Sequence, residues 1–166
     1  NDFREVGIVK DPYNFGTTTV ASATTRRQSY AVYFASAPTA AFDLDEKITQ
    51  ATTGAVGRVV DWDATNNILY FMQEQWANYG IDSSGNVSTF SGANAITGAS
   101  SGAAGTPSSN ASDTVTLAGG STLTFTSGYA NPEMEPDSGD IIYVENRRPI
   151  SRASDQTEDI KIVVEF

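Results

Sequence analysis

Hydrophobic and polar residues alternate with a period of two over several segments of this chain, which is the pattern of β-strands that bury one face. Residues 57–62 and 68–73 are two apolar segments joined by a stretch with two asparagines, a residue type that tolerates turn dihedral angles. Residues 114–117 and 122–125 alternate polar and apolar side chains on either side of Gly119-Gly120. The pattern therefore predicts two β-hairpins.

Further strands are predicted in the same way at 2–9, 29–36, 140–145 and 160–166. In the last segment, apolar residues fall at every second position from Ile160 to Phe166, and the charged residues Lys161 and Glu165 fall on the other face. Helical signals are limited to single turns at 74–79 and 155–159. The predicted fold class is all-β, mainly antiparallel sheet arranged as a small β-barrel or sandwich, with little helix.

An internal repeat supports this fold class. Residues 48–57 read ITQATTGAVG and residues 96–105 read ITGASSGAAG, so the two segments match without a gap. Each predicts a strand, a glycine-containing tight turn and a second strand, because glycine adopts the positive φ that such turns need. Pro107 follows the second copy and makes its exit a poor central strand, so this copy is degenerate.

The alternative for the repeat is a glycine loop that binds phosphate. The repeat has neither the lysine of such loops nor a predicted helix after it, so the turn interpretation is favoured. Small residues and Pro107 also predict a linker from residue 105 to 112. Residues 131–139, with two prolines and several acids, predict an irregular, exposed connection.

The charge and composition narrow the possible functions. Twenty acidic residues oppose ten basic ones, and no Lys or Arg lies between Arg58 and Arg147. An acidic chain repels phosphate backbones and anionic lipid, and no apolar run is long enough to span a bilayer. Neither Cys nor His is present, which removes thiol nucleophiles, imidazole bases and the usual zinc ligands. We expect no nucleic-acid binding, no membrane insertion, no enzyme activity, and no catalytic, cofactor or metal site.

Carboxylate clusters leave two alternatives open. One is calcium binding, and the other is a carboxylate pair of a glycosidase. Solvated acidic surface is favoured over both, because the spacing fits no calcium loop and acids in a proline-rich loop usually serve solubility. The residues considered for calcium are Asp43, Asp45, Glu46, Asp61 and Asp63, and those considered for a glycosidase are Glu133, Glu135, Asp137 and Asp140.

Aromatic residues concentrate around the first predicted hairpin, at Trp62, Tyr70, Phe71, Trp76 and Tyr79. They could form a carbohydrate-binding platform, but packing in the core of the hairpin is favoured. Trp76 and Tyr79 lie just beyond the strand, so these two are the candidates for a partner interface.

The C-terminal segment carries a family resemblance. Residues 139–166 read GDIIYVENRRPISRASDQTEDIKIVVEF. This resembles the closing segment of the baseplate wedge protein of T-even-like contractile-tailed phages, the wedge subunit that dimerises. The matching elements are Gly139, Ile142-Tyr143, Glu145-Asn146-Arg147, Pro149-Ile150, Asp155-Gln156-Thr157-Glu158, Ile160 and Phe166, together with Phe3-Arg4, Ile8 and Asp11-Pro12 near the start.

The resemblance implies a division of the chain. Residues 1–16 and 130–166 are expected to form a β layer like that of the wedge protein, in which residues 146–149 turn the chain. Residues 17–129 are expected to be an inserted β-barrel or sandwich module that contains both repeat copies. The larger N-terminal part of the family protein has no counterpart here, which favours a fragment of a longer protein.

The function implied by the resemblance is that of a structural component of the phage tail baseplate, acting by protein–protein assembly. The implied location is the virion, after assembly in the host cytoplasm. The implied partners are other baseplate or tail proteins and a second copy of the chain, as a dimer. The alternative is a β module displayed on the virion that binds a receptor or glycan.

Three arginines close to the C-terminus, Arg147, Arg148 and Arg152, stand out in this acidic chain. Arginine is favoured at interfaces, so they are predicted to dock onto an acidic partner surface. Internal ion pairing is the alternative, and both can hold. The acids available for such pairing are Glu145, Asp155, Glu158 and Asp159.

Overall fold

Alternating and β-branched segments of the sequence form strands in the computed structural model, which describes residues 4–22, 27–73, 80–136 and 138–147. These residues contain eleven strands and no helix, so the all-β prediction is confirmed for them. The predicted helical turns at 74–79 and 155–159 lie outside the described residues. The strands are β1 (Arg4–Lys10), β2 (Tyr30–Tyr33), β3 (Lys47–Gln50), β4 (Ala55–Asp63), β5 (Ile68–Gln73), β6 (Ile96–Gly98), β7 (Ala104–Gly105), β8 (Asp113–Thr116), β9 (Thr122–Phe125), β10 (Tyr129–Ala130) and β11 (Asp140–Arg147).

The chain divides into two compact units. The first unit combines Asn1–Asp11 with Gly139–Phe166, and the second is Pro12–Ser138. The second unit therefore lies, in sequence, between the two described strands of the first. The assignment of residues 17–129 as a module inserted into a wedge-protein layer stays a prediction.

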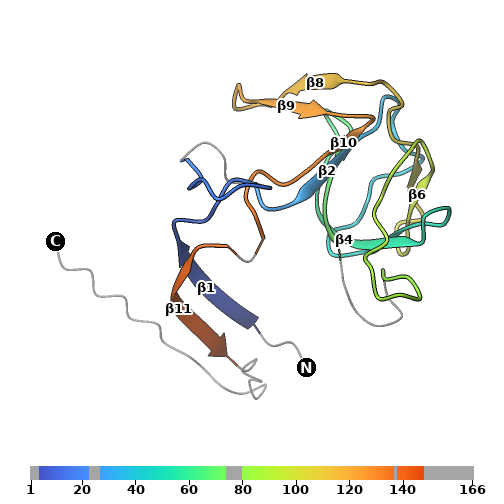
Figure 1. Ribbon diagram of the computed structural model, residues 1–166. Coiled ribbons are helices and arrows are strands. Elements are labelled where there is room, and N and C mark those ends of the chain that lie inside the picture. The colour runs from blue at the N-terminus through green and yellow to red at the C-terminus, as the bar shows by residue number, and fades with distance from the viewer. Residues whose placement is uncertain (1–3, 23–26, 74–79, 137, 148–166) are drawn as a thin grey trace, which may run out of the picture. The chain divides into compact units, whose positions relative to one another are not determined.

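The first unit contains a two-stranded antiparallel ribbon, in which β1 pairs with β11 (Figure 1). The register runs from Arg4 opposite Arg147 to Lys10 opposite Asp140. Asn146 pairs with Glu5, so the predicted turn at residues 146–149 begins too early: the strand continues to Arg147, because β1 supplies backbone partners up to that point.

The second unit is built on a curled seven-stranded antiparallel sheet in the order β10-β2-β5-β4-β3-β6-β7 (Figure 1). Beyond β7, the chain returns to the segment that follows β2. The Thr39 amide donates to the Ala104 carbonyl, and the Ser108 amide donates to the Tyr33 carbonyl, each at 2.9 Å. These two bonds tie the end of the sheet at β7 back to β2 and the segment after it, and the sheet as a whole is a curled half-barrel.

The predicted linker at 105–112 is wrong at its beginning. Gly105, Pro107 and Ser108 are buried. A Cβ atom on Gly105 would lie 2.7 Å from the ring of Phe34, so the small residue is needed for close packing. The predicted connection at 131–139 is also held in place. Asn14 forms an antiparallel β-bridge with Met134, and the Glu135 amide donates to the Tyr13 carbonyl.

The core of the second unit consists of two hydrophobic clusters. The larger one lies inside the curled sheet, where the ring centroids of Phe71 and Phe90 are 4.8 Å apart. The smaller one lies beneath the β8–β9 hairpin and includes the buried Phe125. Phe71 belongs to the larger cluster, and Trp62 and Tyr70 pack against the two clusters, so core packing of these three aromatics is confirmed.

Both repeat copies fold as glycine-turn hairpins, β3–β4 and β6–β7. The matching glycines have positive φ, 72° at Gly54 and 66° at Gly102. The matching isoleucines, Ile48 and Ile96, are fully buried. The second hairpin is the shorter one, because β7 ends before Pro107, as predicted.

Candidate interaction surface

The β1–β11 ribbon carries more than half of the large exposed hydrophobic residues of the described chain. Six of its large hydrophobic residues are exposed, out of eleven in the whole described part. A concentration of this kind marks an interaction site, whereas single exposed hydrophobic residues are normal on a monomer. The exposed fractions are 51% for Ile8, 43% for Val9, 69% for Ile141, 61% for Ile142, 49% for Tyr143 and 51% for Val144.

Apolar residues occupy both faces of the ribbon. Ile8 lies opposite Tyr143, and the next pair along the ribbon, Val9 and Ile141, falls on the other face because successive residues of a strand alternate. The register shifts between these two pairs and leaves Ile142 as an extra residue in β11. A bulge of this kind bends a strand and re-aims its side chains. The ribbon therefore has no polar face in its central part.

The ribbon is stabilised when its apolar faces are covered. Two strands alone are marginally stable in water, and strands that pair on one side only leave an open edge. Among the described strands, β1 and β11 pair only with each other. Full burial of a side chain such as Ile141 contributes roughly 1.5–3 kcal/mol, so covering one face stabilises the ribbon considerably.

Arg147 is the one predicted interface residue that the structure places, and it is the last residue of β11, opposite Arg4. This end of the ribbon thus has two basic residues in register. Arg148, Arg152, Trp76 and Tyr79 lie outside the described residues. The assignment of all five to a partner interface stays a prediction.

The apolar residues of the ribbon were missed by the sequence analysis. The signal in the sequence was the unbroken apolar run 141–144, which leaves a strand without a polar face. That run alone also fits a buried strand. The pairing with Ile8 and Val9 was needed to show an exposed ribbon.

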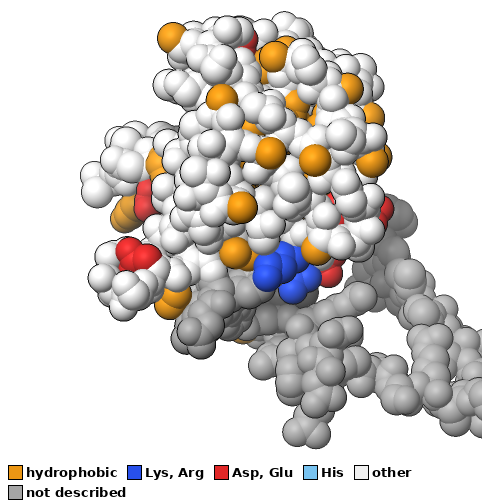
Figure 2. All heavy atoms as spheres, turned by 90° about the vertical axis from the view of Figure 1, so that its right-hand side faces the viewer, with side chains coloured by type: hydrophobic (Ala, Val, Ile, Leu, Met, Phe, Trp, Pro, Cys, Tyr) orange, Lys and Arg blue, Asp and Glu red, His pale blue; other side chains and the backbone are white. Residues whose placement is uncertain are grey.

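No comparable apolar patch appears on the face of the molecule in Figure 2, where hydrophobic side chains lie in separate groups and basic side chains gather in one place.

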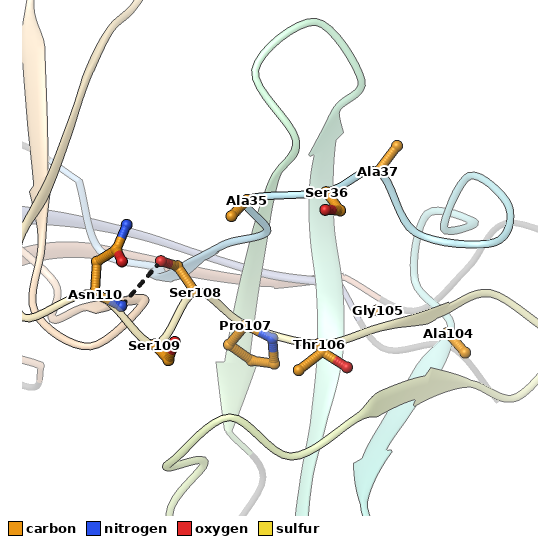
Figure 3. Close-up of a pocket in the computed structure, with 10 residues that line it drawn as sticks. All are labelled: Ala35, Ser36, Ala37, Ala104, Gly105, Thr106, Pro107, Ser108, Ser109 and Asn110. Atoms are coloured by element: carbon orange, nitrogen blue, oxygen red, sulfur yellow. Dashed lines mark hydrogen bonds between the residues drawn. The ribbon is translucent and has the colours of Figure 1, made fainter.

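The second unit does contain a pocket between residues 35–37 and 104–110 (Figure 3). Its lining residues are neither charged nor aromatic. It therefore offers no side chain for acid–base chemistry or for stacking against a sugar ring.

Glu46, one of the acids considered for calcium, holds the turn of the second repeat copy. It is only 6% exposed. Its carboxylate accepts bonds from the Ser101 hydroxyl at 2.7 Å and from the Ser100 and Ser101 amides at 3.0 Å. Burial by itself raises the pKa of Glu46, but the bonds from Ser101, Asp43 and Ser100 outweigh it, so the net pKa is lowered. The ionised carboxylate is a structural acceptor.

Asp63 has a similar role in the β4–β5 hairpin. Its carboxylate accepts the Thr65 amide at 2.9 Å and the Asn66 side-chain amide at 2.7 Å. Burial raises the pKa of Asp63 and the bonds from Asn66 and Thr65 lower it, with a net lowering. The described residues contain no group of three or more acidic side chains placed to hold a metal ion.

The acids considered for a glycosidase are also tied to backbone. Glu133 accepts the Arg27 amide at 3.0 Å, and Glu135 accepts the Gly16 amide at 2.6 Å. Asp140 belongs to β11 in the first unit, and Asp137 lies outside the described residues. Glu133 and Glu135 thus fasten the segments by which the chain enters and leaves the second unit.

Comparison with known proteins identifies one similarity. Residues 115–166 match the family described as Bacteriophage T4, Gp8, a baseplate wedge protein. The matched segment takes in β9, β10 and β11, and it begins inside the stretch predicted as an inserted module. No curated protein and no solved structure matches the chain. The match supports a structural role in the tail baseplate of a phage virion. The described residues contain no helix long and apolar enough to cross a membrane.

Proposed function

We propose that this chain is a structural component of a phage tail baseplate and that it acts by protein–protein assembly. The family match over residues 115–166 supports the location. The observation that carries the mechanism is the β1–β11 ribbon, whose two faces expose apolar residues such as Ile8 and Ile141. Protein interfaces are built from surfaces of this kind, with apolar and aromatic side chains at their centre.

The proposed partners are other baseplate or tail proteins and a second copy of this chain. Apolar faces of the ribbon supply the area to be buried, and Tyr143 supplies an aromatic side chain of the type enriched at interfaces. Arg4 and Arg147 are paired at one end of the ribbon, Arg148 and Arg152 follow in the sequence, and basic residues suit an acidic partner surface. We place the assembly step in the host cytoplasm and the product in the virion.

The proposal gives the chain no catalytic role. Glu46, Asp63, Glu133 and Glu135 are engaged in hydrogen bonds that hold turns and chain crossings. A glycan-binding role is not adopted, because the aromatic platform considered for it loses Trp62 and Phe71 to the core.

The experiment measures how much of the chain is incorporated into assembled phage tails. Tagged chain is supplied to an assembly extract that lacks it, and the tails are purified through high salt, which screens charge contacts but not apolar ones. We expect the unaltered chain and the control Val20→Asp, an exposed position in the second unit, to be retained. Ile141→Asp is expected to reduce retention at least tenfold. Equal retention of Ile141→Asp would reject the ribbon as the assembly surface, and absence of the unaltered chain from tails would reject the structural role.

A further inference from the structure

The outer face of the curled sheet holds a second surface, distinct from the ribbon. The register places Lys47 opposite Arg58 and Arg58 opposite Met72, so these residues form one row across β3, β4 and β5. Paired residues of antiparallel strands share a face. Val59, the neighbour of Arg58 in β4, is buried on the inner face. The row is therefore on the outside of the sheet.

Two more exposed apolar residues adjoin this row. The register of β4 and β5 shifts between Val59 and Asp61, so Val60 is an extra residue, and it is 45% exposed. Leu44, 68% exposed, precedes Asp45, whose amide donates to the Val59 carbonyl at 3.0 Å. We call the set Leu44, Lys47, Arg58, Val60 and Met72 the Arg58 face.

The Arg58 face contains most of the large hydrophobic residues that are exposed in the described part of the second unit. Among the described residues of this unit, five large hydrophobic residues are exposed: Leu44, Val60 and Met72 of the Arg58 face, and Tyr13 and Val20. Three exposed apolar residues and two basic ones match the composition of interface centres, where methionine and arginine are enriched.

Its charge also differs from that of its surroundings. The second unit has eleven acidic residues and four basic ones, and Lys47 and Arg58 are two of the four. Arg27 is bound elsewhere, to the carbonyls of Ser29 and Asn131. The Arg58 face thus brings together two of the basic residues of a unit that is negative overall.

The guanidinium of Arg58 is held in place by the segment before β3. Its Nη1 atom donates to the Asp45 carbonyl at 3.0 Å and lies 3.9 Å from the Asp45 carboxylate. The Asp45 side chain is 89% exposed, and exposed ion pairs contribute little. The ion pair with Asp45, taken alone, is therefore only a weak obstacle to a carboxylate of a partner.

We propose that the Arg58 face docks an acidic segment of a neighbouring tail protein, which sets a carboxylate against Lys47 and Arg58 and an apolar side chain among Leu44, Val60 and Met72. A polyanion such as nucleic acid is disfavoured, because the surrounding unit repels it. The three apolar residues also favour a protein partner. This inference rests on the proposed function, because the partner is met in the tail.

The test uses the absence of cysteine from the chain. Met72→Cys gives a unique thiol for a benzophenone label, and Val20→Cys gives a matched control on the same unit. The labelled chains are assembled into tails, irradiated, and the cross-linked peptides are identified. We expect Met72→Cys to cross-link to a segment with several Asp or Glu residues, and Val20→Cys to yield at least fivefold less of that product.

Charge variants sharpen the result. Adding Arg58→Glu to Met72→Cys is expected to lower the cross-link yield about tenfold, and adding Arg58→Lys is expected to lower it much less. Thermal unfolding will show whether Arg58→Glu impairs folding. If it does, Lys47→Glu replaces it as the charge reversal. Three outcomes overturn the inference while leaving the proposed function intact. The chain is retained in tails but Met72→Cys gives no cross-link, the cross-linked segment has no carboxylates, or neither charge reversal changes the yield. Failure of the unaltered chain to enter tails overturns both.

Discussion

Thr49 and Thr97 face each other across β3 and β6, with their Oγ1 atoms 3.1 Å apart. They occupy the same position in the two repeat copies. The two hairpins are therefore related by a local two-fold axis that passes between these threonines. Because the copies share this geometry, glycines at matching positions have the same structural role. Substitutions at these positions can therefore be compared directly.

The first prediction concerns the positive φ of the repeat turns. Gly54→Ala and Gly102→Ala are each expected to lower the free energy of unfolding by about 1–2 kcal/mol, because a Cβ atom disfavours the left-handed region. Neither position is crowded, so strain alone is responsible. Denaturant titration measures the loss. Gly119→Ala is the control, since it has open space and no positive φ, and a loss there equal to that at Gly102 would contradict the account.

A second prediction concerns the close approach at the other glycine of each copy. Gly105→Ala puts a methyl group 2.7 Å from the Phe34 ring, and overpacking of this kind costs about 1–3 kcal/mol. We expect Phe34→Leu to relieve part of the cost, so that the double variant loses less than the sum of the single ones. Strictly additive losses in urea unfolding would show that Phe34 is not the obstacle.

A third prediction follows from Glu46. Its folded pKa lies below the ordinary value of 4.5, so its contribution to stability is present above that value and is lost as the pH falls through the folded pKa. Glu46→Gln is expected to destabilise the chain at pH 7 by about 2 kcal/mol and to flatten the decline of stability below pH 4.5. Unfolding curves measured from pH 7 to pH 3 test this. If the decline of stability at low pH is the same in Glu46→Gln as in the unaltered chain, other carboxylates are responsible for it.

A fourth prediction concerns the autonomy of the second unit. Pro12–Ser138 contains both core clusters, and its two ends are fastened to each other, as by the Glu135 amide bound to Tyr13 at 2.8 Å. Expressed alone, this segment is expected to unfold cooperatively, with a midpoint within a few degrees of the full chain. Loss of a cooperative transition would mean that the ribbon stabilises the unit.

The hairpins were predictable because their signals are local. The asparagines between β4 and β5, and Gly119-Gly120 between β8 and β9, specify turns within a few residues of the strands that they join. The glycine turns of the repeat were predictable for the same reason. The linker prediction failed at residues 105–108 because small residues suit both flexible segments and close packing, and the position of Phe34 against Gly105 is what distinguishes the two.

The candidate surfaces depended on contacts between distant residues. From the sequence alone, residues 141–144 are an apolar strand, and whether that strand is a core element or an exposed ribbon depends on its partner, β1. The Arg58 face likewise needs the pairing of Lys47, Arg58 and Met72, which come from three strands.

By itself, the sequence determined the all-β class, the main hairpins, the glycine turns and the resemblance of its closing segment, because strand periodicity and turn chemistry act over a few residues. The tertiary structure alone decided that the repeat copies meet at Thr49 and Thr97, and that apolar residues of β1 and β11 lie on both faces of one ribbon. The physical reason is that strand partners and exposure depend on register between segments far apart in the chain, where a shift of one residue exchanges the two faces.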